Sequence, residues 1–487
     1  MFLKAGALSL ALLLASRVLG LVRESSLAAT FGTSGMADVA VLMLTLPDWV
    51  AGVLASGALA YVLVPAWAGQ APAQVQAGER VVARRLVAAA MVLALILLLA
   101  RETALRWLAG GLPPALWPAG MQALVWSAVA LPAALLAAVW STRLQHEQDF
   151  AGLYSANLVV NGMLIAAIAI TALASHAGIQ WLGAGLLLAM FARLAWLRWR
   201  TPAHGRLAET AAAARADLPR ASLWVWAALS AGLPLALPFV ARSIASHGGV
   251  GALATFNYAW KLVELPLMLA IQLVATLALP AIARALATRD ELVARRAIRS
   301  AFALAWALAC AATAALLVGA PAVASLLFGW GRMNAQALAR VAHWGALGAW
   351  GLLPQALIAV ALAVLAGRGR MKPAVLAYAA ALGLLLLAGA AGWSDGGILM
   401  LLLDGLFAAV AAATVAAMGR QALSWLPWRA MGISLAGPLL AAAFIAGGSS
   451  LASWGLWPGL AAAAVVALIV VGITWWGSVD LRAALAR

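Results

Sequence analysis

The sequence is poor in charged residues, histidine and cysteine. Only 9% of its 487 residues are Asp, Glu, Lys or Arg, whereas 66% are hydrophobic and the mean hydropathy is +1.01. Soluble domains carry roughly a quarter charged residues, and no soluble fold of this length hides so much apolar surface. The shortage of charge therefore excludes an ordinary soluble protein and indicates that lipid is the solvent for most of the chain.

Cysteine and histidine are too scarce for a disulfide framework or a metal centre. Cys310 is the single cysteine and lies in an apolar run, so it has no partner for an intrachain disulfide. The five histidines are dispersed, without the spacing of metal ligands. No G-x-x-x-x-G-K-[ST] phosphate loop occurs in the chain. We therefore expect no metal site, no cofactor and no nucleotide-driven chemistry.

Apolar runs of about 20 residues make up most of the chain. In lipid every backbone N–H and C=O needs an internal partner, so only helices or closed barrels can span a membrane. The runs are rich in Ala and Leu and do not alternate with period two, which favours helices. We expect an all-α polytopic membrane protein of about fourteen transmembrane helices, arranged as two six-helix lobes plus two C-terminal helices. The predicted spans are 3–29, 36–68, 84–108, 120–143, 150–174, 178–199, 221–246, 251–285, 297–328, 336–366, 373–393, 396–418, 430–451 and 456–477.

The basic residues predict the orientation. With the N-terminus in the cytoplasm, 23 of the 31 Lys and Arg residues fall in cytoplasmic connections and tails, and five fall on the other side. This is the asymmetry of the positive-inside rule, so the net charge of +16 reflects topology rather than nucleic-acid binding. Arg17 and Arg23 interrupt the first apolar run, which indicates a first helix rather than a signal peptide. We expect a multi-pass protein of the bacterial inner membrane with both termini in the cytoplasm.

The longest polar stretch predicts the domain organisation. It runs from Thr201 to Arg220, is basic and rich in Ala, and follows the sixth predicted span. The predicted domains are an N-terminal six-helix lobe (1–200), a cytoplasmic linker helix (201–220), a C-terminal six-helix lobe (221–418), and two additional helices with a short tail (419–487).

The second span of the chain and the eighth share a proline pattern. Pro47 and Pro65 lie in the second span, and Pro266 and Pro280 lie in the eighth. Each span has an acid close to its first proline. Corresponding broken helices in two lobes are typical of transporters, which bind their substrate between the lobes.

Charged side chains within spans are the candidate functional residues, because each costs about 2.5–3.5 kcal/mol at the centre of the bilayer. They gather in the first two helices of each predicted lobe, and the later spans offer little beyond Asp404. This distribution predicts a charged cavity between the lobes. The set comprises Arg17, Arg23, Glu24, Asp38, Asp48, Arg242, Lys261 and Glu264.

Structural roles remain open for the same residues. Lys261 and Glu264 are three apart, so they share a helical face and can neutralise each other. Arg17 and Arg23 are six apart and lie within roughly 120° of each other around a helix, where they can line one cavity at two depths. Guanidinium groups match phosphate oxygens in bidentate geometry. A cationic cavity therefore favours a pyrophosphate-linked lipid headgroup as ligand.

Short motifs occur along the whole chain. The first is SRVLGLVR (Ser16 to Arg23), followed by Phe31-Gly32, Ala37-Asp38, Leu46-Pro47, Gly57-Ala58 and Val64-Pro65. Later motifs are NYAWKLVELP (Asn257 to Pro266), Leu279-Pro280 and LLFG (Leu326 to Gly329). Together they resemble the motifs of the MurJ/MviN family of lipid II flippases, within the multidrug/oligosaccharidyl-lipid/polysaccharide exporter superfamily, and the resemblance extends over the whole chain.

The resemblance implies a flippase rather than an enzyme. Its substrate would be a polyprenyl-pyrophosphate-linked sugar, such as the lipid II precursor of peptidoglycan, moved from the cytoplasmic to the outer leaflet by alternating access of the lobes. The remaining charges of the set are expected to support the cavity. Partners would be this lipid-linked sugar and membrane lipids, with no nucleic acid, and the chain is expected to be a monomer. Substrate-binding residues implied by the family motifs are Arg17, Arg23, Asp38 and Lys261, the last standing where the family usually has Arg.

Four positions depart from the family pattern and keep alternatives open. Ala51 and Gly52 replace basic residues, and Ser56 and Trp260 replace acids. A first alternative is therefore a flippase for another lipid-linked oligosaccharide, such as an exopolysaccharide or O-antigen unit. A drug/cation antiporter would need an acid-lined cavity, and a glycosyltransferase or polymer ligase would need acids or histidines in a sizeable outer loop. We expect transport to be coupled to the membrane potential or to a monovalent ion.

Overall fold

The computed structural model describes residues 2–53, 58–174, 178–201, 219–271, 290–447 and 454–485, with 274, 278, 282, 284 and 285. Helices dominate these residues, none of which lies in a β-strand. Twelve helical segments among them are long and apolar enough to cross a membrane, and they lie at twelve of the fourteen predicted spans. The first predicted span is α1 (Phe2–Phe31), and the eighth begins with α11 (Ala252–Pro266) and η4 (Leu267–Ile271). The predicted all-α membrane fold is confirmed.

The chain divides into two compact units. Unit 1 consists of Met1–Phe239, Gly249–Ala254 and Trp330–Arg332, and unit 2 of Val240–Gly248, Thr255–Gly329 and Met333–Arg487. Residues 202–218, which make up most of the predicted linker helix, lie outside the described residues. The domain boundaries expected from the sequence therefore stay a prediction.

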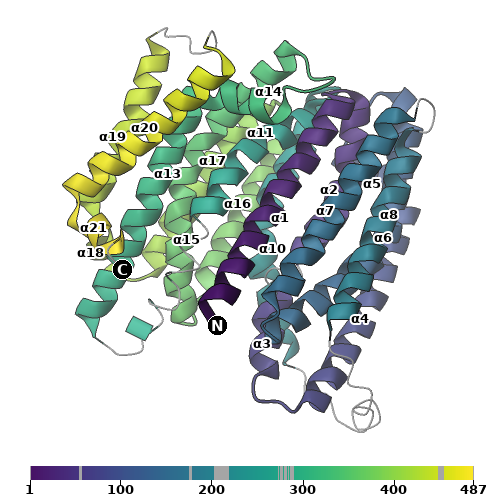
Figure 1. The fold of residues 1–487 in the computed structure, drawn as a ribbon, viewed down its shortest axis with the longest axis horizontal. Helices are drawn as coiled ribbons and strands as arrows, with labels where there is room; N and C mark the ends of the chain where they lie inside the picture. Colours follow the sequence, from purple (N-terminus) through teal and green to yellow (C-terminus); the bar gives the residue numbers. More distant parts are fainter. Residues whose placement is uncertain are drawn as a thin grey trace. The chain divides into compact units, whose positions relative to one another are not determined.

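In unit 1, α6 packs against α2, α3, α4 and α8, and α7 lies between α1 and α8 (Figure 1). One predicted span is broken: residues 84–108 form the end of α4 and all of α5. The predicted span 36–68 contains α2 and α3, and residues 54–57 between them lie outside the described residues. The α4–α5 break falls at Ala100, directly before the charged pair Arg101 and Glu102. The bounds are α2 Gly35–Val53, α3 Leu59–Trp67, α4 Pro72–Leu99, α5 Arg101–Leu108, η2 Pro114–Leu116, α6 Trp117–His146, α7 Phe150–Leu173, α8 Gly178–Arg200 and α10 Ala221–Ala245.

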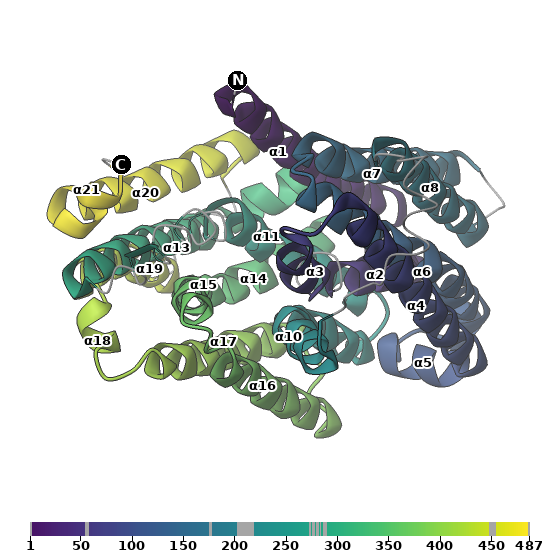
Figure 2. The ribbon, with the colours of Figure 1, turned by 90° about the horizontal axis from the view of Figure 1, so that it is seen from below.

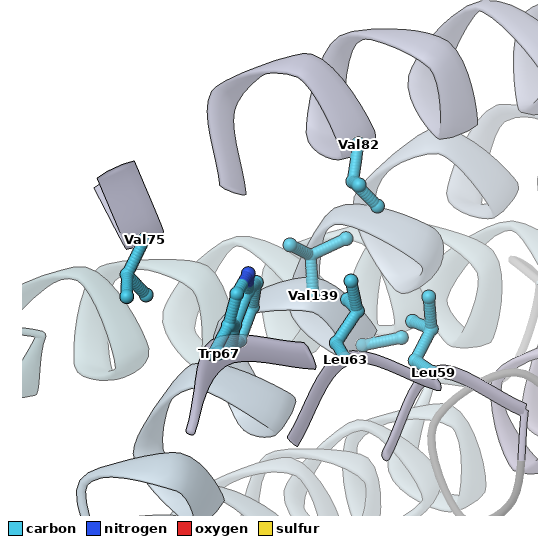
Figure 3. Packing of buried hydrophobic residues seen from close by; sticks show 7 residues of the cluster. Leu59, Leu63, Trp67, Val75, Val82 and Val139 are labelled. Carbon is cyan, nitrogen blue, oxygen red and sulfur yellow. The ribbon is translucent and has the colours of Figure 1, made fainter. Parts of the chain in front are cut away.

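The α3 helix is held by one apolar face (Figure 3). Leu59, Leu63 and Trp67 are spaced four residues apart, so they share a side of the helix, and each is at most 2% exposed. They pack with Val82 of α4 and Val139 of α6. Because lipid is as apolar as these side chains, van der Waals packing rather than the hydrophobic effect holds the contact.

In unit 2, α13 packs against α14, α15, α19 and α20 (Figure 2). The two helices expected after the second lobe are α19 and α20, and both belong to this unit. The predicted span 336–366 is interrupted by the short η5, where Gly348 and Gly351 flank the break. The bounds are η3 Ser246–Gly248, α13 Glu291–Phe328, α14 Ala335–Gly348, η5 Ala349–Gly351, α15 Leu352–Gly367, α16 Lys372–Ala390, α17 Gly396–Ala417, α18 Ala422–Trp425, α19 Trp428–Ala446, α20 Leu456–Gly477 and α21 Val479–Leu485.

Small residues allow α13 and α20 to approach closely. A Cβ atom on Gly319 would lie 2.5 Å from the Cβ of Ala463, and one on Gly459 would lie 2.7 Å from the Cβ of Ala322. Interfaces between membrane helices are rich in small residues for this reason. A larger side chain at either glycine requires the two helices to move apart.

Helix starts in the connections are set by polar side chains that accept backbone N–H groups at 2.8–3.1 Å. These caps satisfy donors that the first helical turn leaves free. At the α7 cap, burial pushes the carboxyl pKa up, but hydrogen bonds from Arg200 and Gly152 outweigh it and hold the pKa of Asp149 below its usual value. The caps are Asp149 for α7, Asp290 for α13, Asn334 for α14 and Asp395 for α17.

Candidate functional site

Three charged residues of α1 and α2 meet around one guanidinium in unit 1. Arg23 donates from Nη2 to Oε1 of Glu24 and from Nη1 to Oδ2 of Asp48, both at 2.8 Å. The side chains of Arg23 and Glu24 are 11% and 4% exposed, whereas that of Asp48 is 38% exposed. Arg23 therefore joins two helices through a buried acid and an accessible one.

A third helix brings another arginine to this cluster. Arg193 lies on α8, where its Nε atom is buried and has no hydrogen-bond partner in the described part of the chain. It interacts electrostatically with Asp48. From its position near the end of the sixth predicted span, Arg193 is one of the 23 basic residues predicted for the cytoplasmic connections. The signal that separates it is its depth, since it lies well before the end of α8 at Arg200.

Arg17 lies on the same continuous helix as Arg23. It is exposed and sits about 9 Å further along the α1 axis, toward the N-terminus. The carbonyl of its neighbour Ser16 accepts a hydrogen bond from Asn161 of α7 at 3.5 Å. The cluster of Arg23, Arg193, Glu24 and Asp48 is neutral by charge count, and Arg17 adds one positive charge about 9 Å away along α1.

Asp38 is held by backbone groups. Its Oδ2 accepts the N–H of Gly251 at 2.7 Å, and its Oδ1 accepts the N–H of Ala254 at 2.8 Å. The residue is 2% exposed. These two donors lie at the start of α11, so the carboxylate caps that helix.

Glycines bring distant motifs together around this cap. Gly251 has φ +80° and packs so tightly against Thr33 that a Cβ there would overlap the Thr33 carbonyl. Gly331 has φ +61° and meets the carbonyl of Ala29 in the same way. The N–H of Arg332 donates to Ala29 at 2.9 Å. The residues around the Phe31-Gly32 and Ala37-Asp38 motifs therefore contact both the start of α11 and the segment that follows the LLFG motif.

In unit 2, the candidate charges form two local pairs. Nη1 of Arg242 donates to Oδ1 of Asn257 at 3.0 Å. Nζ of Lys261 lies 2.6 Å from Oε2 of Glu264, and both side chains are about a quarter exposed. The structure thus shows the neutralising Lys261–Glu264 pair that the spacing allowed. Whether the eight candidate residues bind substrate stays a prediction.

The departures from the family pattern are packed positions. Ala51 is buried, and a Cβ on Gly52 would contact Leu235 at 3.6 Å. Trp260 stacks on Phe407 with ring centroids 6.3 Å apart. Ser56 lies outside the described residues. Aliphatic and aromatic contacts therefore take the place of charge at three of these four positions.

Asp404 of α17 is a half-buried acid outside the candidate set. Its two carboxylate oxygens are inaccessible, and Oδ1 lies against Gly351. Within the described residues, no three His, Cys, Asp or Glu side chains are grouped to hold a metal ion. Asp404 therefore stands alone in its part of unit 2.

The family model described as lipid II flippase MurJ matches residues 27–476. The chain belongs to the lipid II flippase MurJ family. The match contains Asp38, Asp48 and Lys261, whereas Arg17 and Arg23 precede it. This result confirms the resemblance that the motifs indicated. No curated protein matches the chain.

The fold of this MurJ family member is similar to those of solved transporters. A lipid II flippase MurJ in an inward closed conformation superposes with a TM-score of 0.77 at 13% identity, over 96% of this chain and 99% of that one. An inward-facing multidrug resistance MATE family transporter gives a TM-score of 0.63 at 15% identity, over 85% and 96%. A MOP superfamily transporter from Pyrococcus furiosus gives 0.55 at 15%, over 89% and 96%. The chain is thus a multi-pass transporter, and the prediction that it is no enzyme is confirmed.

Proposed function

We propose that this chain flips a polyprenyl-pyrophosphate-linked sugar from the cytoplasmic to the outer leaflet of the bacterial inner membrane, by alternating access of its two units. Membership of the MurJ family carries the proposal. The excess of arginine over acid around α1 supports it, because a cationic site suits a pyrophosphate and disfavours a cationic drug. The lipid II precursor of peptidoglycan is the first candidate substrate, which would give the chain a role in cell-wall biogenesis and cell shape.

Capture of the headgroup begins at α1 in this proposal. Arg17 is exposed and offers a guanidinium to the pyrophosphate. Phosphate oxygens then displace the accessible carboxylate of Asp48 from Arg23, while Glu24 stays in its buried pair. Lys261 changes partner from Glu264 to the substrate in unit 2. Each exchange replaces one charge-assisted hydrogen bond by another, so binding does not strand a buried charge.

The membrane potential is the proposed driving force, with a monovalent ion as the alternative. Two negative charges that move outward across about 100 mV, inside negative, gain roughly 4–5 kcal/mol. In this scheme no cofactor is needed, and the chain works as a monomer. Proteoliposomes in which neither a potential nor an ion gradient changes the rate of flipping would contradict this coupling.

The proposed orientation can be tested at the two ends of α17. Cys310 is buried and 0% exposed, so the native chain should not react with a membrane-impermeant maleimide in intact cells. Ala391 and Gln421 are exposed in the connections before and after α17. We expect Ala391→Cys to be labelled from outside, and Gln421→Cys only after the membrane is opened. The reverse pattern would invert the proposed topology.

Complementation tests the substrate. When the lipid II flippase of a bacterial host is depleted, expression of this chain should restore survival and the exposure of lipid II at the outer face. Arg17→Met should lower the flipping rate at least tenfold, because a hydrogen bond to a charged group contributes about 1.5–3 kcal/mol. The measurement is outer-face lipid II per folded molecule.

Arg200→Met is the matched control for loss of an exposed arginine. Its guanidinium pairs with Asp149 at the start of α7, so flipping should continue. Transport that survives Arg17→Met would remove this residue from the site. Failure of the wild-type chain to rescue, although correctly inserted, would favour the second candidate below.

A second candidate substrate is another lipid-linked oligosaccharide, such as an exopolysaccharide or O-antigen unit. The observation in its favour is the apolar packing at Ala51, Gly52 and Trp260, where the family pattern has charge. Expression in hosts that lack a flippase for such a unit separates the two candidates, because only the correct substrate restores surface polysaccharide.

A further inference from the structure

A cavity of about 190 Å³ lies in unit 1, away from the residues proposed to bind the transported lipid. Three helix ends build it. The cavity lies near the start of α4 and the ends of α6 and α8. Its lining residues are Gln76, Glu79, Arg80, Trp140, Arg143, Arg198 and Thr201.

The spacing of these residues explains why they converge. On α4 the lining residues are at positions i, i+3 and i+4, which share one face of a helix. On α6, Trp140 and Arg143 are three residues apart, as are Arg198 and Thr201 at the end of α8. The cavity borders the apolar α3–α4–α6 cluster, which contains the neighbouring Val82 and Val139. The site therefore rests on packed helices rather than on loops.

Arg143 forms the buried wall of the cavity. It is 3% exposed, whereas Arg80 and Arg198 are exposed. Its Nη2 pairs with Glu147 at 2.7 Å, but its Nε and Nη1 are buried and have no hydrogen-bond partner among the described residues. A buried charged donor that lacks a partner is costly. The guanidinium therefore lines the cavity and keeps two buried donors without a partner among the described residues.

The charge balance defines the ligand. Glu79 accepts a hydrogen bond from Trp140 and interacts electrostatically with Arg80, Arg143 and Arg198. One carboxylate of the lining thus faces three guanidinium groups, and Glu147 outside the lining pairs with one of them, which leaves one excess positive charge. Oxyanions, and phosphate above all, match the bidentate geometry of arginine.

The remaining polar groups and the size agree with such a ligand. Oε1 of Gln76 is buried without a partner in the described part of the chain, and rotation of the amide would present its NH₂ donors instead. An engineered cavity of about 150 Å³ admits benzene, with six heavy atoms. A tetrahedral phosphate has five, so it fits a cavity of about 190 Å³.

We infer that this cavity is a binding site for a phosphate group, separate from the transport site, with Arg143 as its buried anchor and Arg80 and Arg198 at its mouth. In the proposed orientation it faces the cytoplasm at the membrane surface. A free phosphate and the headgroup of an anionic phospholipid present the same chemistry. In either case the bound phosphate ties α4, α6 and α8 together.

The test uses the full chain in two arms. In detergent, binding of radiolabelled inorganic phosphate is measured by equilibrium dialysis. In phosphatidylcholine nanodiscs with and without phosphatidic acid, bound lipid is measured by native mass spectrometry, and thermal stability is followed in both arms. We expect saturable binding in at least one arm, with a melting temperature that rises with ligand concentration. Phosphate alone would assign a soluble ligand, and phosphatidic acid alone a lipid headgroup.

Two substitutions should weaken binding, and one of them should stabilise the ligand-free protein. Arg143→Met should weaken binding at least tenfold. Gln76→Glu places a carboxylate among the three arginines, so it should abolish binding and raise the melting temperature of the ligand-free protein. A merely misfolded variant would not show that rise. If Arg143→Met fails to fold, the binding measured for Gln76→Glu and Arg198→Gln tests the site instead, and both variants should bind more weakly than the wild type.

Arg200→Ala is the matched control, because its guanidinium pairs with Asp149 outside the cavity. It should bind as the wild type does. The inference is overturned if the wild-type chain binds neither probe, or if Gln76→Glu and Arg198→Gln bind as tightly as the wild type.

Discussion

Arg23→Met is expected to lower both the stability and the transport activity of the protein. The substitution removes the ion pairs to Glu24 and Asp48 and leaves Glu24, which is 4% exposed, without its arginine. Breaking a buried ion pair on one side costs about 3–5 kcal/mol. We expect a marked fall in the melting temperature in detergent, measured by size-exclusion chromatography after heating, together with loss of flipping.

The double variant Arg23→Met/Glu24→Gln separates these two effects. It removes the stranded charge, so most of the stability should return, whereas flipping should not, because the guanidinium that binds the headgroup is still absent. Arg17→Met is the companion control on the same helix. It should lose flipping at an unchanged melting temperature, since Arg17 is exposed. An Arg23→Met protein as stable as the wild type would contradict the structural role of this pair.

Asp38→Ala is expected to destabilise unit 1 by about 2–4 kcal/mol. The carboxylate is 2% exposed and accepts the N–H groups of Gly251 and Ala254. Its removal leaves two buried donors without this acceptor, each worth roughly 1–3 kcal/mol. Because these two bonds are the helix cap, and caps are typically worth about 0.5–2 kcal/mol, we expect the lower half of the summed range. The melting temperature of the purified protein measures the loss.

Asp38→Asn keeps one acceptor oxygen and should recover about half of this stability. Ser34→Ala is the control for a weak cap at the start of α2, where the exposed Ser34 accepts the N–H of Ala37 at 3.3 Å, and it should change little. A substrate-binding role for Asp38 makes a separate prediction, because it requires a lower flipping rate per folded molecule in Asp38→Asn. If Asp38→Ala were as stable as the wild type, the cap would have no energetic importance.

Composition was sufficient to predict most of the membrane-spanning helices. Runs of Ala and Leu that exceed the thickness of the bilayer have no other stable state than a helix, and α6, α7, α8, α13, α17 and α20 lie where these runs predict them. The predicted span 336–366 coincides with one membrane-length segment, Ala335–Gly367. The difference lies inside another long run: the span predicted at 84–108 is the end of α4 and α5, which meet at Ala100. Hydropathy does not detect such breaks, since a short irregular segment can be as apolar as the helices it joins.

The candidate site could likewise be predicted only in part from the sequence. The cost of charge in lipid was enough to single out Arg23, Asp38 and Asp48, and the spacing of Lys261 and Glu264 was enough to pair them. The partner of Asp38 is more than 200 residues away, and Arg193 was counted with a connection although it interacts with Asp48. Helical periodicity relates residues within one turn or two, so it carries no information on such pairs.

The sequence by itself determined that the protein lies in a membrane, that it is helical, and which charged residues fall within apolar spans. Each of these follows from local composition and from the cost of polar groups in lipid. Only the tertiary structure decided which charges neutralise each other and which keep free donors. Arg23 pairs with two acids, whereas Arg143 lines a cavity, pairs with one acid and has two buried donors without a partner among the described residues. That difference depends on how helices from distant parts of the chain pack, since packing sets both the distance between charges and their access to water or ligand.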